Sequence, residues 1–153
     1  MMSPTGDMPS SAGGAIYASL LVYARQHGGR AYPDNAAFLV ELPNRKSFSP
    51  DAAYYTGPRT RMKFLQGAPD FAAEVRSEGD YGSAAEREIT AKRDDYFAAG
   101  TKVVWDVDLL SDDVVRVYRA GAPQTPTVYR RGETAEAEPA VPGWKFVVDE
   151  LFD

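Results

Sequence analysis

Apolar side chains in this sequence recur at the two spacings that distinguish strands from helices, most clearly between residues 69 and 105. Residues 69–77 alternate as a strand does, because its successive side chains point to opposite faces. One face is apolar and comprises Phe71, Ala73 and Val75. The other carries charge at Asp70, Glu74 and Arg76. A strand that only packs has no need of such a charged face, so the pattern indicates a functional surface.

The segment that follows shows helical spacing over residues 83–99. Ser83 with Glu86 three residues later is typical of a capping box at a helix start, and Gly100 suits the left-handed residue after a helix end. Lys92 falls on the stripe that is expected to face the sheet, which also holds Ala85, Ile89, Tyr96 and Ala99.

A lysine on a sheet-facing stripe needs either a route to solvent or a carboxylate partner. The preceding strand supplies two carboxylates, so we predict that the ammonium of Lys92 lies near Glu74 or Asp70 and farther from Glu88. The alternative is an i,i+4 pair between Lys92 and Glu88 on a solvated helix, with the strand face an exposed ion-pair surface of little energetic value.

The remaining periodicity predicts one further helix and several strands. Residues 15–26 carry apolar side chains at helical spacing, whereas residues 1–14 are rich in Ser, Pro and Gly and are typical of a flexible arm. We expect strands at 30–42, 50–56, 69–77, 101–108, 114–119, 127–131 and 144–148, and loops at 43–49, 60–68 and 132–142. This order predicts one α/β domain over residues 15–153, a mixed sheet flanked by two main helices with additional C-terminal strands.

Composition narrows the chemistry that such a domain can perform. The 153 residues include no cysteine and one histidine, which excludes thiolate sites and multi-histidine zinc sites. A metal would therefore be held by carboxylates, which favours magnesium or manganese. The net charge of −5 argues against a general nucleic-acid binder, and we interpret the basic residues Arg59, Arg61 and Lys63 as a solvated loop.

No apolar run is long enough to span a bilayer, and the first residues lack the basic and apolar regions of a secretory signal. The absence of cysteine fits the cytosol. We therefore expect a cytoplasmic protein with no membrane partner.

Two dipeptides, Pro50-Asp51 and Pro69-Asp70, each set an aspartate at a strand start. Asp51 is followed 23 residues later by Glu74-Val75-Arg76, a spacing similar to the PD-(D/E)XK nuclease motif. Carboxylates on neighbouring strands can hold a magnesium ion, which lowers the pKa of a bound water and neutralises charge on a phosphate. A nearby lysine orients that water and stabilises the same charge.

Beyond the motif, the chain resembles the Uma family of restriction-endonuclease-like proteins over nearly its whole length. The matching stretches are MSPTG at 2–6, SPD at 49–51, PD through EVRS at 69–77, Lys92 with Tyr96 and Gly100, VVW and VD at 103–108, Val115 with Tyr118, and PGW to Phe152 at 142–152. The resemblance implies a nuclease-like α/β core that cleaves DNA with magnesium or manganese. It implies Asp51, Asp70 and Glu74 as metal ligands and Lys92 as the assisting lysine.

Several features depart from that family pattern, among them Asp7-Met8-Pro9 where a histidine often follows the MSPTG stretch. Arg76 stands at the third motif position and is counted among the candidate catalytic residues. Arginine remains protonated and is no direct replacement for a lysine, although it can bind phosphate. Asp106 stands where the family prefers an apolar residue. Three functions stay open: a metal-dependent DNA endonuclease, a catalytically silent nuclease fold that serves as a binding or regulatory module, and an enzyme of another class. The sequence leaves the oligomeric state open, with a homodimer among the options.

Overall fold

The computed structural model describes residues 5–153, and a six-stranded mixed sheet forms its centre. The strand order is β1 (Arg30–Pro33), β4 (Ala52–Tyr55), β6 (Phe71–Val75), β7 (Val103–Val107), β8 (Val115–Arg119) and β9 (Ala122–Tyr129). Only β6 and β7 are parallel neighbours, while β4 and β8 run antiparallel to them. The mixed α/β architecture that the hydrophobic pattern predicts is confirmed.

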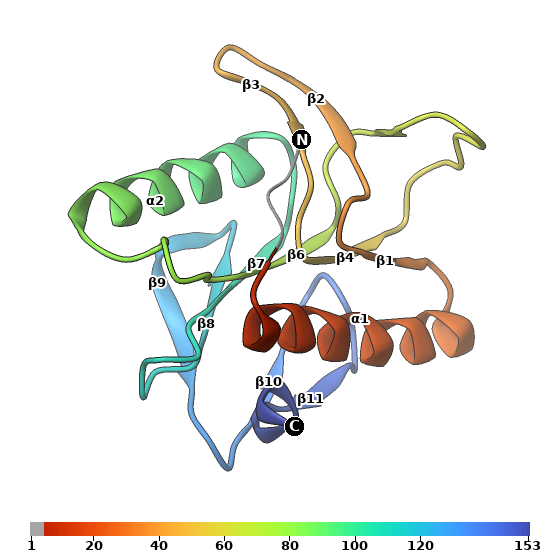
Figure 1. Cartoon of the computed structure of the whole chain (residues 1–153). Helices are drawn as coiled ribbons and strands as arrows, with labels where there is room; N and C mark the ends of the chain where they lie inside the picture. The colour runs from red at the N-terminus through yellow and green to blue at the C-terminus, as the bar shows by residue number, and fades with distance from the viewer. Residues whose placement is uncertain (1–4) are drawn as a thin grey trace.

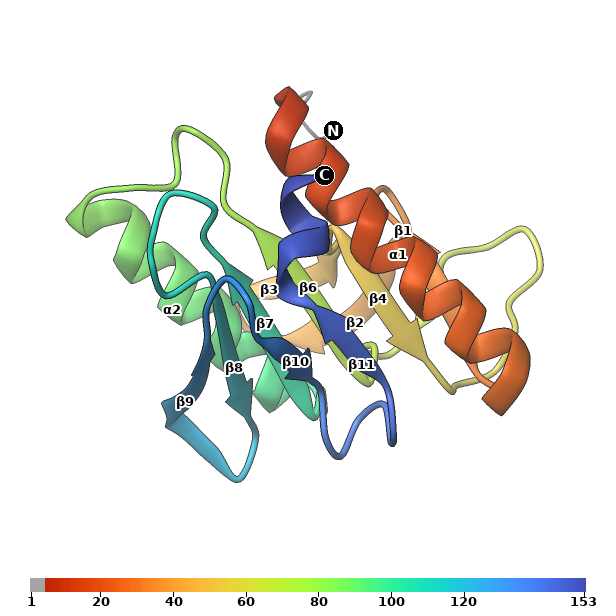
Figure 2. The same cartoon turned by 90° about the horizontal axis from the view of Figure 1, so that it is seen from below.

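Each face of this sheet is covered by one long helix, as Figure 1 shows. Helix α1 (Asp7–His27) covers the face of Phe71, Ala73 and Val75, together with β10 (Thr134–Glu136), β11 (Lys145–Val147) and the 3-10 helix η1 (Val148–Phe152). Figure 2 shows β10, β11 and η1 beside α1 on that side of the sheet. Trp105 and Trp144 stack within this larger core, at 5.1 Å between ring centroids.

Helix α2 (Ser83–Ala98) covers the opposite face beside a small three-stranded sheet. That sheet has the order β3 (Arg45–Phe48), β2 (Phe38–Leu42) and β5 (Leu65–Gln66). Phe48 of β3 stacks on Tyr96 of α2 at 4.0 Å between ring centroids, and both rings pack against Ala72 and Val104 of the main sheet. Helix α2 and the small sheet thus both pack over β6, the strand that carries Glu74.

The segment β6–α2–β7 is a strand, crossover helix and parallel strand, as the periodicity predicts. The alternation along β6 is also confirmed, because Phe71, Ala73 and Val75 belong to the α1-side core and Ala72 to the α2-side core. Gly100 follows α2 with a φ of 108°, which an L side chain rarely adopts. The turn after α2 therefore requires glycine.

The prediction of a flexible arm over residues 1–14 is wrong from Asp7 onward, because α1 begins there. Residues 1–4 lie outside the described part. Ala12, Ile16 and Leu20 are completely buried at four-residue spacing, so packing on the sheet stabilises the helix despite Gly13 and Gly14. Tertiary burial thus outweighs the low helix propensity of glycine.

Several smaller predictions also need correction. The expected strand over residues 30–42 is two strands, β1 and β2, which belong to different sheets. The loops expected at 43–49, 60–68 and 132–142 contain β3, β5 and β10. The capping box does not form, because α2 has Gly82 at its N-cap and no side-chain cap, while the carboxylate of Glu86 binds Arg76 instead.

Candidate active site

Glu74 projects from β6 toward α2 and meets two side chains of that helix. Lys92 Nζ lies 2.9 Å from Glu74 Oε2, and the Tyr96 hydroxyl donates to the same oxygen at 2.5 Å. No ion pair within 4.0 Å joins Lys92 to Glu88 in the described chain, so the predicted geometry of Lys92 is confirmed. The Glu74 and Lys92 side chains retain 26% and 33% exposure, which leaves this pair accessible from solvent.

Asp51 lies beside Glu74 because β4 and β6 pair antiparallel. Ala52 pairs with Ala73, and the backbone N–H of Asp51 donates to the Ala73 carbonyl at 3.1 Å. Asp51 Oδ2 in turn accepts the Val75 N–H at 2.6 Å. Helix α1 closes the other side, since a Cβ placed on Gly13 would lie 3.5 Å from Asp51 Cβ. This carboxyl is therefore held between the sheet and the helix.

The protonation of Asp51 is strongly perturbed by this position. Burial raises the pKa of Asp51 to about 7, and the negative charge of Glu74 acts in the same direction. The Val75 N–H and the more distant Lys92 ammonium act against that rise in pKa. The charge of Glu74 is thus close enough to act on the ionisation of Asp51.

Each of these two acids also keeps one oxygen without a protein partner. Within residues 5–153, no hydrogen bond reaches Asp51 Oδ1 or Glu74 Oε1, because the contacts made by Val75, Lys92 and Tyr96 use the other oxygen of each group. Carboxylate oxygens are the ligands that magnesium and manganese prefer. The carboxylate pair, Asp51 and Glu74, therefore fits the donor chemistry of a hard divalent cation.

Asp70 does not join this pair, and the expectation of three converging metal-binding carboxylates is wrong. Asp70 lies at the opposite end of β6, where Oδ2 accepts the Thr56 N–H at 2.7 Å and the Thr56 hydroxyl at 2.9 Å, and Lys102 lies 3.8 Å from Oδ1. In the described part of the chain, no three His, Asp or Glu side chains are grouped to hold a metal. Four residues of extended strand separate Asp70 from Glu74, about 13 Å.

The basic residues Arg59, Arg61 and Lys63 lie at the same remote end of the sheet. They belong to the loop that follows β4, whereas Asp51 precedes that strand. All three side chains are exposed, which confirms a solvated loop.

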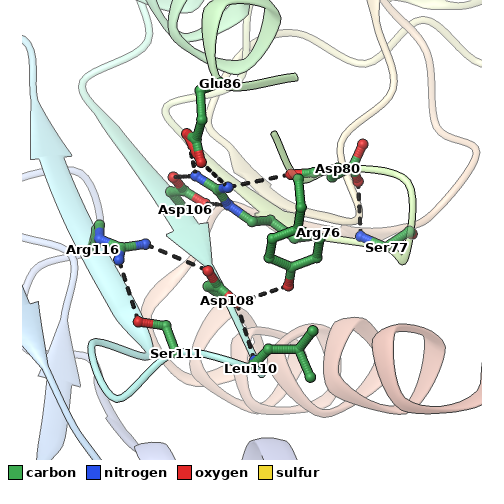
Figure 3. A network of polar contacts seen from close by, with 10 residues as sticks. Arg76, Ser77, Asp80, Glu86, Asp106, Asp108, Leu110, Ser111 and Arg116 are labelled. Atoms are coloured by element: carbon green, nitrogen blue, oxygen red, sulfur yellow. Dashed lines mark hydrogen bonds and ion pairs between the residues drawn. The ribbon is translucent and has the colours of Figure 1, made fainter. Parts of the chain in front are cut away.

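Arg76 is enclosed in a second polar centre on the same face of the sheet (Figure 3). Its Nε and Nη2 donate to the two oxygens of Asp106 at 2.9 and 2.8 Å, and its Nη1 and Nη2 donate to those of Glu86 at 2.5 and 3.0 Å. A fifth bond, of 3.3 Å, runs from Nη1 to the Asp80 carbonyl. We call Arg76, Glu86 and Asp106 the closed ion-pair cluster.

This cluster corrects the expectation that Arg76 binds phosphate. A guanidinium has five N–H donors, and all five are used within the protein. The cluster also explains both departures from the family pattern at once, since Asp106 on β7 is the counter-charge of Arg76 on β6. One buried charge requires the other.

Hydrogen bonds around Asp108 extend the network toward the loop before α2. Asp108 Oδ1 accepts the Tyr81 hydroxyl at 2.7 Å and the Leu110 N–H at 3.0 Å, and Arg116 lies 3.9 Å from Oδ2 (Figure 3). Asp80 Oδ2 accepts the Ser77 N–H at 2.8 Å. The loop between β6 and α2 is therefore held by Asp80, which bonds to Arg76 and Ser77, and by Tyr81, which bonds to Asp108. These contacts fix the start of the helix that carries Lys92.

A pocket of about 210 Å³ opens between α2 and the strands β6 and β7. Glu74, Lys92, Arg76 and Asp106 line it, and so does Arg93. Sequence reasoning missed Arg93, although it lies four residues after Ile89 and three before Tyr96, the helical spacing that could have identified it. It also missed Gly13 behind Asp51; the i,i+4 series of Ala12, Ile16 and Leu20 was the available signal for that segment of α1.

Comparison with known proteins gives independent information about the fold. No curated protein matches the chain. The crystal structure of "a putative nuclease belonging to DUF820 from Anabaena variabilis" superposes with a TM-score of 0.75 at 17% identity. The alignment covers 99% of this chain and 84% of that one, which shows a shared fold.

No helix within residues 5–153 combines the length and the apolar character required to cross a membrane.

The family model Uma2, described as "Putative restriction endonuclease", matches residues 1–149. That match agrees with the resemblance read from the motifs, and it supports a nuclease-like function. The chain belongs to the Uma2 family.

Proposed function

We propose that this protein is a metal-dependent DNA endonuclease whose site is the carboxylate pair, Asp51 and Glu74, together with Lys92. The observation that carries the proposal is their convergence: Asp51 just before β4 and Glu74 on the adjacent strand β6, each with a free oxygen, lie beside a lysine 2.9 Å from Glu74. Family membership supports the reaction class. Asp70 and Arg76 have no catalytic part in this proposal.

The roles of the residues follow from their contacts. The free oxygens of Asp51 and Glu74 would hold a magnesium or manganese ion, which when bound activates water and neutralises charge on a phosphodiester. Lys92 lies beside Glu74 and is placed to stabilise charge that develops on the phosphate oxygens. Tyr96 orients Glu74 by donating to its other oxygen. Asp51 must lose its proton to act as a ligand, so binding of the ion is coupled to pH.

A catalytically silent nuclease fold is the second candidate, and one observation favours it. Two carboxylates rather than three converge, so fewer protein ligands are present than the family resemblance implies. Such a protein would keep the pocket and bind a ligand without cleaving it.

Plasmid nicking separates the two candidates. Purified wild-type protein with manganese and supercoiled plasmid should convert the plasmid to open circles, and Glu74→Gln and Lys92→Met should both lower the rate at least a hundredfold. Lys102→Met is the matched control, because Lys102 is an exposed lysine paired with Asp70 at the far end of the strand.

Equal nicking by wild type and Lys92→Met would remove Lys92 from the mechanism. No nicking by the wild type in manganese or magnesium would favour the silent fold. A homodimer stays a prediction that sedimentation of the wild-type protein would test.

A further inference from the structure

Arg93 is a buried cation for which the fold supplies no hydrogen bond. It is 8% exposed, and its Nε is completely buried without a partner. Its guanidinium lies on the ring of Tyr118, 3.7 Å from the centroid, and within residues 5–153 it forms no ion pair or hydrogen bond. Burying a charged donor without a partner is unfavourable, which points to a ligand that the protein itself does not provide.

Glu86 and Asp106, two acids of the closed ion-pair cluster, are already bound to Arg76. Glu86 is close enough for the charge of Arg93 to help lower the Glu86 pKa, after the larger effect of the hydrogen bonds from Arg76. Both oxygens of Glu86 and both oxygens of Asp106 accept from Arg76. Glu88, on the exposed side of α2, forms no ion pair in the described chain. Within residues 5–153, Arg93 therefore has no carboxylate as an ion-pair partner.

Arg93 lines the same pocket as Lys92 and Glu74. The contrast with Arg76 is direct, since Arg76 uses all five donors within the protein and Arg93 uses none. A guanidinium that packs on an aromatic ring is restrained in position, and its planar fork suits bidentate contact with a phosphate.

We infer that Arg93 binds a phosphate group of a nucleic-acid backbone in the pocket beside Lys92. This inference rests on the proposed function for the identity of the ligand. Arg93 binds and positions the strand, whereas Lys92 lies next to the carboxylate pair. The stack on Tyr118 holds the guanidinium in place and keeps it partly dehydrated.

The test measures binding rather than cleavage. A fluorescein-labelled DNA duplex is titrated with wild-type protein, Arg93→Gln and Arg87→Gln in EDTA, so that no metal supports turnover. Arg87 is the matched control, an exposed arginine of the same helix. Arg93→Gln should weaken binding about tenfold, and the slope of log affinity against log salt should fall by about one for the lost phosphate contact. Arg87→Gln should change both quantities little.

Arg93→Lys keeps the charge but loses the fork, so its affinity should lie between wild type and Arg93→Gln. It also tests the inference if the glutamine variant does not fold. Equal affinity and salt slope in wild type and Arg93 variants, or absence of DNA binding by the wild type, would overturn the inference. The proposed function fails separately, when wild-type protein binds DNA in an Arg93-dependent way but does not nick plasmid with manganese.

Discussion

Two polar centres on the α2-facing side of the sheet, the carboxylate pair with Lys92 and the closed ion-pair cluster, differ in how fully their hydrogen bonds are satisfied. In the cluster, Arg76 and Asp106 are 6% and 5% exposed, and every guanidinium donor is used. In the carboxylate pair, each acid keeps a free oxygen and Glu74 is 26% exposed. One centre is complete without a ligand, and the other is not.

This difference teaches which charges bind a ligand and which maintain the fold. A saturated network holds its elements together, because the buried Arg76 and Asp106 compensate the desolvation of each other. An unsaturated pair costs stability, and proteins keep such groups where a ligand completes them. The high pKa of Asp51 is the clearest sign of that cost.

The largest expected effect comes from breaking the closed ion-pair cluster on one side only. Arg76→Leu leaves the carboxylate of Asp106 buried without its partner and should lower the free energy of unfolding by about 3–5 kcal/mol. The double variant Arg76→Leu with Asp106→Leu removes both charges and should return to within about 1 kcal/mol of wild type. Urea denaturation of the wild type, both single variants and the double variant measures this coupling. If the losses in unfolding free energy of the two single variants add up to the loss of the double variant, the cluster does not act as a unit.

The next effect concerns Asp51 and pH. Since the folded protein raises the pKa of Asp51 to about 7, folding favours the protonated acid, and stability from this group is present at low pH and lost as pH rises from about 4 to 7. Asp51→Asn removes that dependence and should stabilise the protein by about 4 kcal/mol at pH 8, with little change at pH 4. Urea unfolding at the two pH values measures the difference.

The same Asp51→Asn variant should lose manganese binding, because an amide is a poorer ligand than a carboxylate. Asp70→Asn is the control, since Asp70 contacts Thr56 at the other end of β6. If Asp70→Asn raises the free energy of unfolding at pH 8 as much as Asp51→Asn does, the stability gain comes from general charge and not from the carboxylate pair.

A smaller effect is expected for Tyr96→Phe. The variant deletes the hydroxyl that donates to Glu74 at 2.5 Å but keeps the ring that stacks on Phe48. Glu74 retains Lys92 and some solvent, so the loss should be about 1–2 kcal/mol in the free energy of unfolding. Thermal unfolding by circular dichroism gives the value. A loss near that of Arg76→Leu would place Glu74 among saturated, fold-maintaining groups and would break the comparison.

The smallest effect on stability is expected for Lys92→Met. Because Lys92 and Glu74 are both partly solvated, their ion pair should contribute less than about 1 kcal/mol, and the methionine keeps most of the stem packing. Urea denaturation at low and high salt measures it, with Lys102→Met alongside. A large loss of stability in Lys92→Met would make the residue structural and would weaken its assignment to the site.

The sequence predicted the local unit β6–α2–β7 well, because strand alternation and helical stripes depend on near neighbours. Lys92 was expected to meet Glu74 or Asp70 on these grounds, and it meets Glu74 at 2.9 Å. The helix start at Asp7 was missed, because glycine-rich residues form helix there only through burial against the sheet. The match of the Uma2 family model agrees with the ordered motifs rather than with any single one.

The sequence alone predicted the alternation along β6, the stripe of α2 and a carboxylate partner for Lys92, either Glu74 or Asp70, because these follow from fixed backbone periods. Only the tertiary structure decided the fates of the other charged residues. The β4–β6 pairing selects Asp51 and leaves Asp70 at the far end, and the β6–β7 pairing gives Asp106 to Arg76 while Arg93 receives no counter-charge. The physical reason is that strand register and burial set which distant charges meet and how strongly each is desolvated.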